Sequence, residues 1–277
     1  MLADSDQADV GLRPNQFKIT FYQTLRKCVW LFPLSLVILI PMCCLIPYFM
    51  ALHFAHLAPI FPYVSDGGGK SPQAGYFSQL IDLISISIFI TGFCRYKMLK
   101  YIIHLKHSKS GKISQETLIH LDRCNFASSI LVYLSAFGSI VIGNFRVTEI
   151  VFFHFFGTSI CFAFMLAYAS FQVYISYHLS KWDKNESTPY TMLIITLFAG
   201  LSLIICLIGS FISIIQAGYY QFFNDDFRLH WNSDQNGYLA HLVGTIGEWC
   251  AINSISPFYL CLFNRMKRFN EWDKVKF

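Results

Sequence analysis

The stretch TMLIITLFAGLSLIICLIGSFISIIQA, residues 191–217, decides the fold because it carries no charged side chain over its whole length. A helix rises about 1.5 Å per residue, so roughly 20 apolar residues cross the ~30 Å hydrocarbon layer of a bilayer. The strict alternation of apolar and polar residues that is typical of membrane β-strands is absent. Residues 191–217 therefore predict a transmembrane helix.

Five further apolar runs extend this interpretation to the whole chain of 277 residues, of which 55% are hydrophobic and only 13% charged. Soluble domains carry about a quarter charged residues. The sequence predicts an all-α, polytopic membrane protein, a bundle of six transmembrane helices, with a membrane domain over 29–263 between tails at 1–28 and 264–277. The six expected spans are 29–52, 77–98, 126–143, 150–174, 191–217 and 239–263.

The basic residues predict the orientation of the bundle. Eighteen of the 21 Lys and Arg side chains lie in the two tails and in the loops after the second and fourth spans, whereas Lys70, Arg146 and Arg228 stand alone in the other three loops. Basic residues favour the cytosolic side, so both termini are expected in the cytosol. These basic residues, which give the chain a net charge of +5, then form a juxtamembrane collar able to attract anionic lipids, phosphoinositides among them. Because the basic residues are divided among tails and loops, a nucleic-acid partner is not expected.

The stretch PYVSDGGGKSP, residues 62–72, ends in the Gly-Lys-Ser of a phosphate-binding P-loop. The full P-loop pattern is G-x-x-x-x-G-K-[ST]. With Gly69 as its second glycine, the first glycine would be at position 64, which is Val64. The stretch lies in an expected non-cytosolic loop, where ATP is absent. Turn chemistry explains it better, because Asp66 can accept backbone N–H bonds and the glycines tolerate unusual backbone angles.

Four polar side chains fall inside expected spans: Asp82, His154, His241 and Glu248. Charges within a bilayer are costly and usually face other helices or a water-filled cavity. The cluster could be a proton or ion path, or a hydrogen-bonded contact that only fixes helix packing.

Catalytic and metal-binding signatures are absent from the sequence, which lacks both the H-E-x-x-H and the G-x-S-x-G spacing. We therefore predict no catalytic residue, metal or cofactor, with an intramembrane lipid-modifying enzyme as an alternative. The nine cysteines lie within or beside spans, so no disulfide framework is expected. Juxtamembrane cysteines can be palmitoylated, and the candidates are Cys28, Cys94, Cys124 and Cys261.

Several stretches in order resemble the DRAM (damage-regulated autophagy modulator) family of six-span membrane proteins. They are HLAPIFPYVSDGGGKSP at 56–72, CRYK at 94–97, GNFRVTEIVFFHFFG at 143–157 and LHWNSDQNGYLAHLVGTIGEW at 229–249. The chain departs from the family pattern at Gly67, Gln73, Asp82 and Arg146. The motif and polar-core candidates are His56, Pro62, Tyr63, Ser65, Asp66, Asp82, Asn144, Phe145, His154, Gly157, His230, Trp231, Asn232, Gly237, Tyr238, His241, Glu248 and Trp249, with Tyr168 and Gln172 extending the match.

The resemblance implies a lysosomal or endolysosomal membrane protein that promotes autophagy without a known catalytic act. Asp66, His154, His241 and Glu248 would then form the polar core of a lumenal cap. A plasma-membrane relative that organises phosphoinositide synthesis through its basic loop and tail is the first alternative. A transporter that couples to protons or ions through the His/Glu cluster is another. The resemblance leaves the protein partners unknown.

Overall fold

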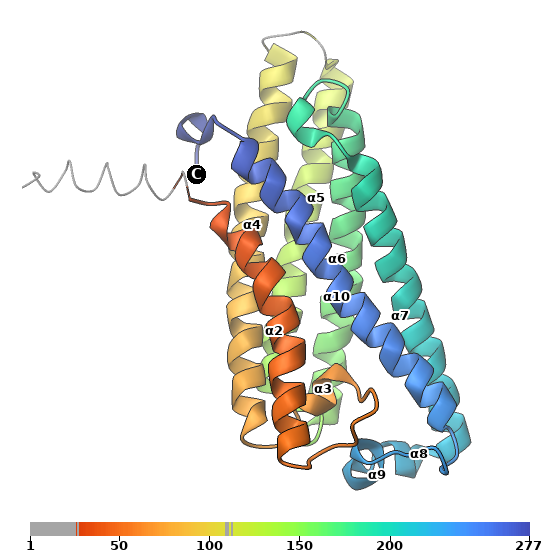
Figure 1. Cartoon of the computed structure of the whole chain (residues 1–277). Coiled ribbons are helices and arrows are strands. Elements are labelled where there is room, and N and C mark those ends of the chain that lie inside the picture. The colour runs from red at the N-terminus through yellow and green to blue at the C-terminus, as the bar shows by residue number, and fades with distance from the viewer. Residues whose placement is uncertain (1–25, 27, 109–110, 112) are drawn as a thin grey trace, which may run out of the picture.

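The fold is described from a computed structural model, which covers residues 26, 28–108, 111 and 113–277. Within these residues all regular secondary structure is helical, which confirms the all-α prediction. Short helices connect long ones, and the long helices are the structural frame of the protein (Figure 1). The long helices are α2 (Leu31–His53), α4 (Gln73–Ser108), α5 (Gln115–Asn144), α6 (Val151–Leu179), α7 (Pro189–Ala217) and α10 (Tyr238–Arg268).

Five of the long helices, α2, α4, α5, α6 and α7, are long and apolar enough to cross a membrane. The remaining one, α10, has 31 residues but is more polar, because His241, Glu248 and Asn253 interrupt its apolar surface. It runs obliquely across the bundle and packs extensively against α7 and α2 (Figure 1). The structure thus supports a multi-pass membrane protein with several spanning helices.

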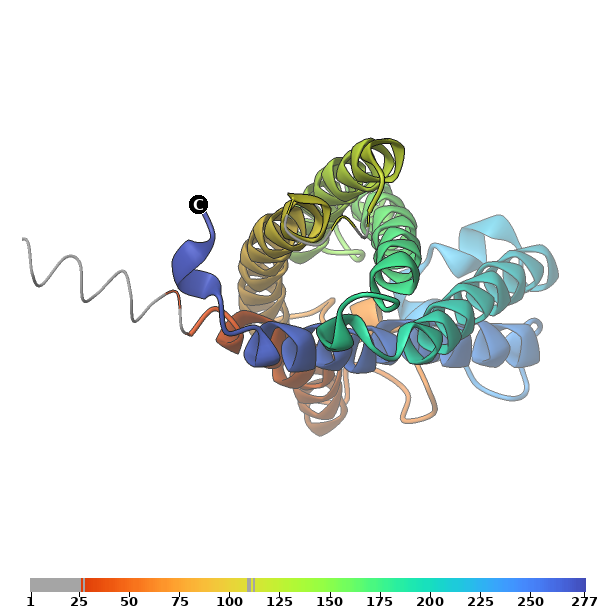
Figure 2. The same cartoon turned by 90° about the horizontal axis from the view of Figure 1, so that it is seen from above.

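The long helices form a closed ring. In chain order each packs against the next, and α10 completes the circuit by packing against α2 (Figure 2). The closest pairs are α5 with α6 and α7 with α10. The six-residue link between α5 and α6 is too short for any arrangement but two antiparallel neighbours.

Small residues allow the closest helix pairs to approach each other. A Cβ atom at Gly157 of α6 would lie 3.0 Å from the carbonyl oxygen of Gly138 in α5. A Cβ atom at Gly209 of α7 would lie 2.5 Å from the backbone nitrogen of Gly244 in α10. Such contacts between backbones replace the hydrophobic driving force that is missing between helices in lipid.

The two ends of the ring differ in structure. At one end, here called the cap end, the short helices α3 (Val64–Gly67), α8 (Tyr219–Phe222) and α9 (Asp225–Leu229) cover the bundle (Figure 1). At the opposite end, here called the basic end, the chain after α10 folds back through the short 3₁₀ helix Trp272–Lys274. Trp272 is buried there, so the expected C-terminal tail is an ordered part of the fold.

The helices at the basic end extend beyond the expected spans. Helix α4 continues ten residues past position 98, and α5 begins eleven residues before position 126. The expected basic loop is therefore mostly helical, although Lys109 and Lys112 lie outside the described residues. Of the expected N-terminal tail at 1–28, the structure describes only Arg26 and Cys28.

Candidate functional site

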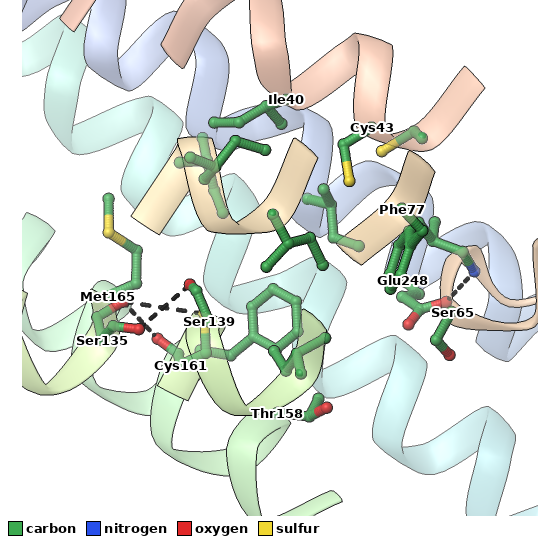
Figure 3. A pocket seen from close by; sticks show the side chains of 18 of the residues that line it. Ile40, Cys43, Ser65, Phe77, Ser135, Ser139, Thr158, Cys161, Met165 and Glu248 are labelled. Carbon is green, nitrogen blue, oxygen red and sulfur yellow. Dashed lines mark hydrogen bonds between the residues drawn. The ribbon is translucent and has the colours of Figure 1, made fainter. Parts of the chain in front are cut away.

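The ring of helices encloses an elongated cavity of roughly 100 Å³ (Figure 3). Helices α2, α3, α4, α5, α6 and α10 all contribute side chains to its wall. Most of these side chains are aliphatic, aromatic or sulfur-containing, as expected for the centre of a membrane bundle. Representative lining residues are Ile40, Cys43, Phe77, Ile142, Met165 and Ile252.

Glu248 of α10 and Ser65 of α3 lie close together at the cap end of this cavity, away from Met165 at the other end (Figure 3). Ser135 and Ser139 line the cavity near Met165 (Figure 3), but their hydroxyl groups already donate to the carbonyl oxygens of Cys161 and Ser135. Oε2 of Glu248 accepts a hydrogen bond of 2.8 Å from the backbone N–H of Val64. Within the described part of the chain, neither the second carboxylate oxygen, Oε1, nor the Ser65 hydroxyl has a hydrogen-bond partner. Both groups can therefore form a hydrogen bond with a molecule that enters the cavity.

His154 of α6 also lines the cavity, but its ring is already engaged. Its Nδ1 donates to the carbonyl oxygen of Phe145 at 2.7 Å, which ties α6 to the end of α5. The stacking of Phe145 on Phe153, with ring centroids 5.0 Å apart, strengthens the same corner. Gly157, one turn further along α6, lies in the α5–α6 contact described above.

Helix α3 is held over the cavity by side chains of α7 and α10. The hydroxyl groups of Tyr63 and Ser210 are hydrogen-bonded at 2.7 Å. The indole N–H of Trp249 donates to the carbonyl oxygen of Pro62 at 2.9 Å. Together with the bond from Val64 to Glu248, these contacts attach both the start of α3 and the residues before it to the long helices.

Asp66 lies on the other side of α3, where it belongs to a buried ion cluster. Its Oδ1 accepts from Nε of Arg228 in α9 at 3.0 Å, and Nη2 of the same arginine donates to Asp225 at 2.7 Å. We call Asp66, Arg228 and Asp225 the cap triad. Burial raises the pKa of the Asp66 carboxyl group, and the adjacent Arg228 guanidinium counteracts part of that rise.

His241 is placed by aromatic contacts. The Trp231 ring stacks on the imidazole at a centroid distance of 4.4 Å, and Tyr63 meets it edge-on at 5.1 Å. The Trp231 indole in turn donates to the carbonyl oxygen of Asn236. Gly237 follows with a φ of 81°, a left-handed conformation that favours glycine and that starts α10.

The remaining predicted residues lie apart from the cavity. Asn144 donates to Asp82 at 3.1 Å, which joins α5 to α4. His56 is hydrogen-bonded to Gln73 beside the first loop. Asn232 and Tyr238 lie in and after the turn that precedes α10, and His230 bonds to the backbone of α9.

The predicted polar core is therefore divided. Glu248 and His154 line one cavity, whereas Asp66 and His241 each have separate partners in the cap. Asp66 and Glu248 still act on the same element: Glu248 binds the backbone of α3 at Val64, and Asp66, within α3, connects it to Arg228 of α9.

A second buried ion cluster, at the basic end, was missed by the sequence analysis. Glu186 accepts two hydrogen bonds of 2.7 Å from Arg95 and forms an ion pair of 3.0 Å with Arg265. We call Arg95, Glu186 and Arg265 the basic-end triad; their side chains are between 0% and 3% exposed. Gln172 accepts from Nε of Arg95, and Ser176 donates to Glu186.

Arg95 and Arg265, which were counted in the expected juxtamembrane collar, are buried in this cluster instead. They point into the protein because Glu186, on the connection from α6 to α7, neutralises them there. The available signals were the two acidic residues of that connection, Asp183 and Glu186, together with Gln172, which belongs to the family match.

All nine cysteines are free thiols, as expected. Cys28, Cys124 and Cys261 are half-buried, whereas Cys94 is buried in the bundle and its thiol is inaccessible to an acyl-transferring enzyme. Among the described residues, no group of three or more His, Cys, Asp or Glu side chains is arranged to hold a metal ion.

A family model described as the Frag1/DRAM/Sfk1/Cwh43P N-terminal domain matches residues 28–267, which include all the long helices, the cap and both triads. The chain belongs to this family. The match extends over the cavity wall as well, so the ring and its cap lie within the family domain.

Curated relatives within the family are similar over most of their length. The chain is 26% identical to DNA damage-regulated autophagy modulator protein 2 of Homo sapiens over 82% of this chain and 80% of the relative. For DNA damage-regulated autophagy modulator protein 1 of Homo sapiens, the identity is 26% over 74% of this chain and 77% of the relative. The corresponding Xenopus laevis protein 1 is 23% identical over 78% and 81%. No solved structure matches the chain significantly.

Proposed function

We propose that this chain is a non-enzymatic, multi-pass regulator of autophagy that acts at the lysosomal or endolysosomal membrane. The observation that carries the proposal is the similarity to autophagy modulator protein 2 over about four-fifths of both chains. The structure supports a regulatory role because the motif residues mainly hold the cap: Tyr63, Trp249 and Asp66 all anchor α3 or the residues beside it.

The proposed topology has six spans and cytosolic termini. Helix α10 would be the sixth span, since it lies in the ring between two apolar helices despite its polar residues. The cap would then face the lumen. Protease protection of epitope tags placed at both termini tests this arrangement, and a glycan on Asn185, in the one Asn-x-Ser sequence near the basic end, would contradict it.

The proposed role is tested by expressing the tagged chain in cells that lack it and measuring its location and autophagic flux. We expect co-localisation with lysosomal markers and a reduced flux that the chain restores. A variant that disrupts the cap, Arg228→Met, should fail to restore flux. Cell-surface localisation with unchanged flux would overturn the proposal.

A second candidate function is the organisation of phosphoinositide metabolism at the plasma membrane. The observation that favours it is an open pocket of roughly 660 Å³ at the basic end, whose lining includes the cationic side chains Arg26 and Lys267 beside Trp30 and Trp272. Such a combination suits an anionic headgroup at a membrane surface. Cell-surface localisation that depends on phosphoinositide levels, and that is lost in Lys267→Glu, would support it.

A further inference from the structure

We propose that the central cavity is a binding site for a single-chain amphiphile whose headgroup donates a hydrogen bond. The ligand class is a long-chain alcohol or amine, with the headgroup at Glu248 and Ser65 and the chain along the apolar wall. This inference goes beyond the proposed role in autophagy and does not depend on it.

The polar end of the cavity specifies the headgroup. Oε1 of Glu248 accepts no hydrogen bond from the described residues, while Oε2 is fixed by the Val64 N–H. A carboxylate oxygen is an acceptor, so it selects a donor rather than an ester or ether oxygen. Ser65 provides a second polar group beside it (Figure 3). A donor at this position would give Oε1 the hydrogen bond that the described residues do not provide.

The opposite end of the cavity determines what kind of hydrocarbon chain the ligand can have. Its wall consists largely of aliphatic and aromatic side chains such as Ile84, Ile88 and Met165. Apolar cavities of about 150 Å³ stay dry and accept small hydrocarbons. A cavity of roughly 100 Å³ is therefore suited to several methylene groups, but not to a complete long chain.

A second, smaller cavity takes the chain a short way further, and the rest of a long chain extends beyond it into the surrounding hydrocarbon layer. It measures roughly 30 Å³, lies between α6, α7 and α10, and shares Phe162, Met165 and Ile255 with the central cavity. The seam between α6 and α7 is the most loosely packed contact in the ring. Ala199 in this seam is half-buried, so the seam is a lateral path from the hydrocarbon layer to the central cavity.

The test uses the full chain, purified and reconstituted in phosphatidylcholine nanodiscs. The probe is hexadecanol carrying a diazirine in the middle of its chain, and labelled peptides are identified by mass spectrometry. We expect labels on peptides of α6 and α10 that line the cavities, with competition by unlabelled hexadecanol and hexadecylamine but not by hexadecane or methyl palmitate. The stronger of the two competitors shows whether the site prefers an alcohol or an amine.

Glu248→Gln is the decisive variant. Its carbonyl oxygen can still accept from Val64, so the cap remains in place, but its amide nitrogen presents donors to the cavity instead of an acceptor. Hexadecylamine, whose ammonium group only donates, should compete at least about ten-fold more weakly, which is the effect of losing one hydrogen bond to a charged group. Hexadecanol can accept a hydrogen bond from the amide and should lose less. A thermal unfolding measurement checks that the variant is folded.

Ala199→Phe tests the path, and Ile194→Phe on the exposed face of α7 is its matched control. The first should slow labelling of the central cavity, and the second should not. Labels confined to lipid-facing residues, or equal competition by hexadecane, would overturn the proposal. So would undiminished competition by hexadecylamine in Glu248→Gln.

Discussion

The two buried ion triads at opposite ends of the bundle have inverse compositions. In the cap triad one guanidinium, that of Arg228, lies between the carboxylates of Asp66 and Asp225. In the basic-end triad one carboxylate, that of Glu186, lies between two guanidiniums. Asp225 is 31% exposed, whereas every side chain of the basic-end triad is almost fully buried. Water can therefore solvate part of the cap triad, whereas the charges of the basic-end triad are stabilised by protein groups alone.

Glu186→Gln tests the contrast between the two triads most directly, and we expect it to have the largest effect on stability. The substitution preserves shape but leaves Arg95 and Arg265 buried without a counter-charge. Arginine does not lose its proton in proteins, so no change of ionisation can relieve the cost. We expect the free energy of unfolding of the purified protein to fall by about 3–5 kcal/mol, the usual cost of removing one partner of a buried pair.

The matched control is Glu149→Gln, which removes an exposed ion pair of 2.8 Å with Arg146. It should change the free energy of unfolding by less than about 0.5 kcal/mol. Equal stability of the two variants would show that burial does not make the Glu186 cluster more important than an exposed ion pair.

Arg228→Met is the corresponding change at the cap end, and its effect should be smaller. The substitution leaves Asp66 buried without its cation, but a carboxylate can take up a proton and become neutral. We expect a loss of about 2–3 kcal/mol at pH 7.5, measured by the same unfolding assay.

The loss in Arg228→Met should also shrink as the pH falls. Burial raises the pKa of folded Asp66, and without Arg228 nothing counteracts that rise. The folded state then binds a proton more readily than the unfolded state, so stability increases as the pH falls through the folded pKa toward the unfolded one. Glu186→Gln should show no corresponding recovery through its arginines, and a loss in Arg228→Met that grows at low pH would refute this account.

The sequence predicted one end of the molecule much better than the other. The apolar runs predicted the cap-end limits of the long helices to within a few residues, because length and hydrophobicity dominate in lipid, whereas α4 and α5 extend well beyond the expected spans at the basic end. Asp66, Tyr63 and Trp249 were singled out as motif residues, and all three contact their partners in the cap. Arg228, the partner that neutralises Asp66, was counted only as a lone loop charge, because their pairing across 162 positions depends on the folded loops.

The basic-end triad could not be predicted from the sequence for a similar reason. Arg95 and Arg265 lie beside the expected ends of the second and sixth spans, where basic residues are normally exposed to the cytosol. Only the packed ring brings both beside Glu186. The cavity could not be predicted from the sequence either, because its wall consists of residue types that any packed membrane helix contains.

Glu248→Ala tests how much a single hydrogen bond contributes to the cap. It removes the acceptor of the Val64 N–H and should lower the free energy of unfolding by about 1–2 kcal/mol, less than either triad substitution. Glu248→Gln retains an acceptor and should be nearly neutral in the same assay. If the alanine variant is as stable as the native chain, Tyr63 and Trp249 suffice to hold α3.

Lys70→Ala should have the smallest effect, although Lys70 belongs to the Gly-Lys-Ser sequence that resembles a P-loop. Its ammonium group lies 3.9 Å from Asp226, whose side chain is 92% exposed. An ion pair in water gains little energy, so the free energy of unfolding should change by less than about 0.5 kcal/mol. The neighbouring Gly69 carbonyl accepts from Thr148 at 2.7 Å, which holds this part of the loop whether or not the lysine is present. A substantial loss of stability in Lys70→Ala, reversed by high salt, would mean that exposed charges also secure the cap. The contrast between the triads would then have to be explained by something other than burial.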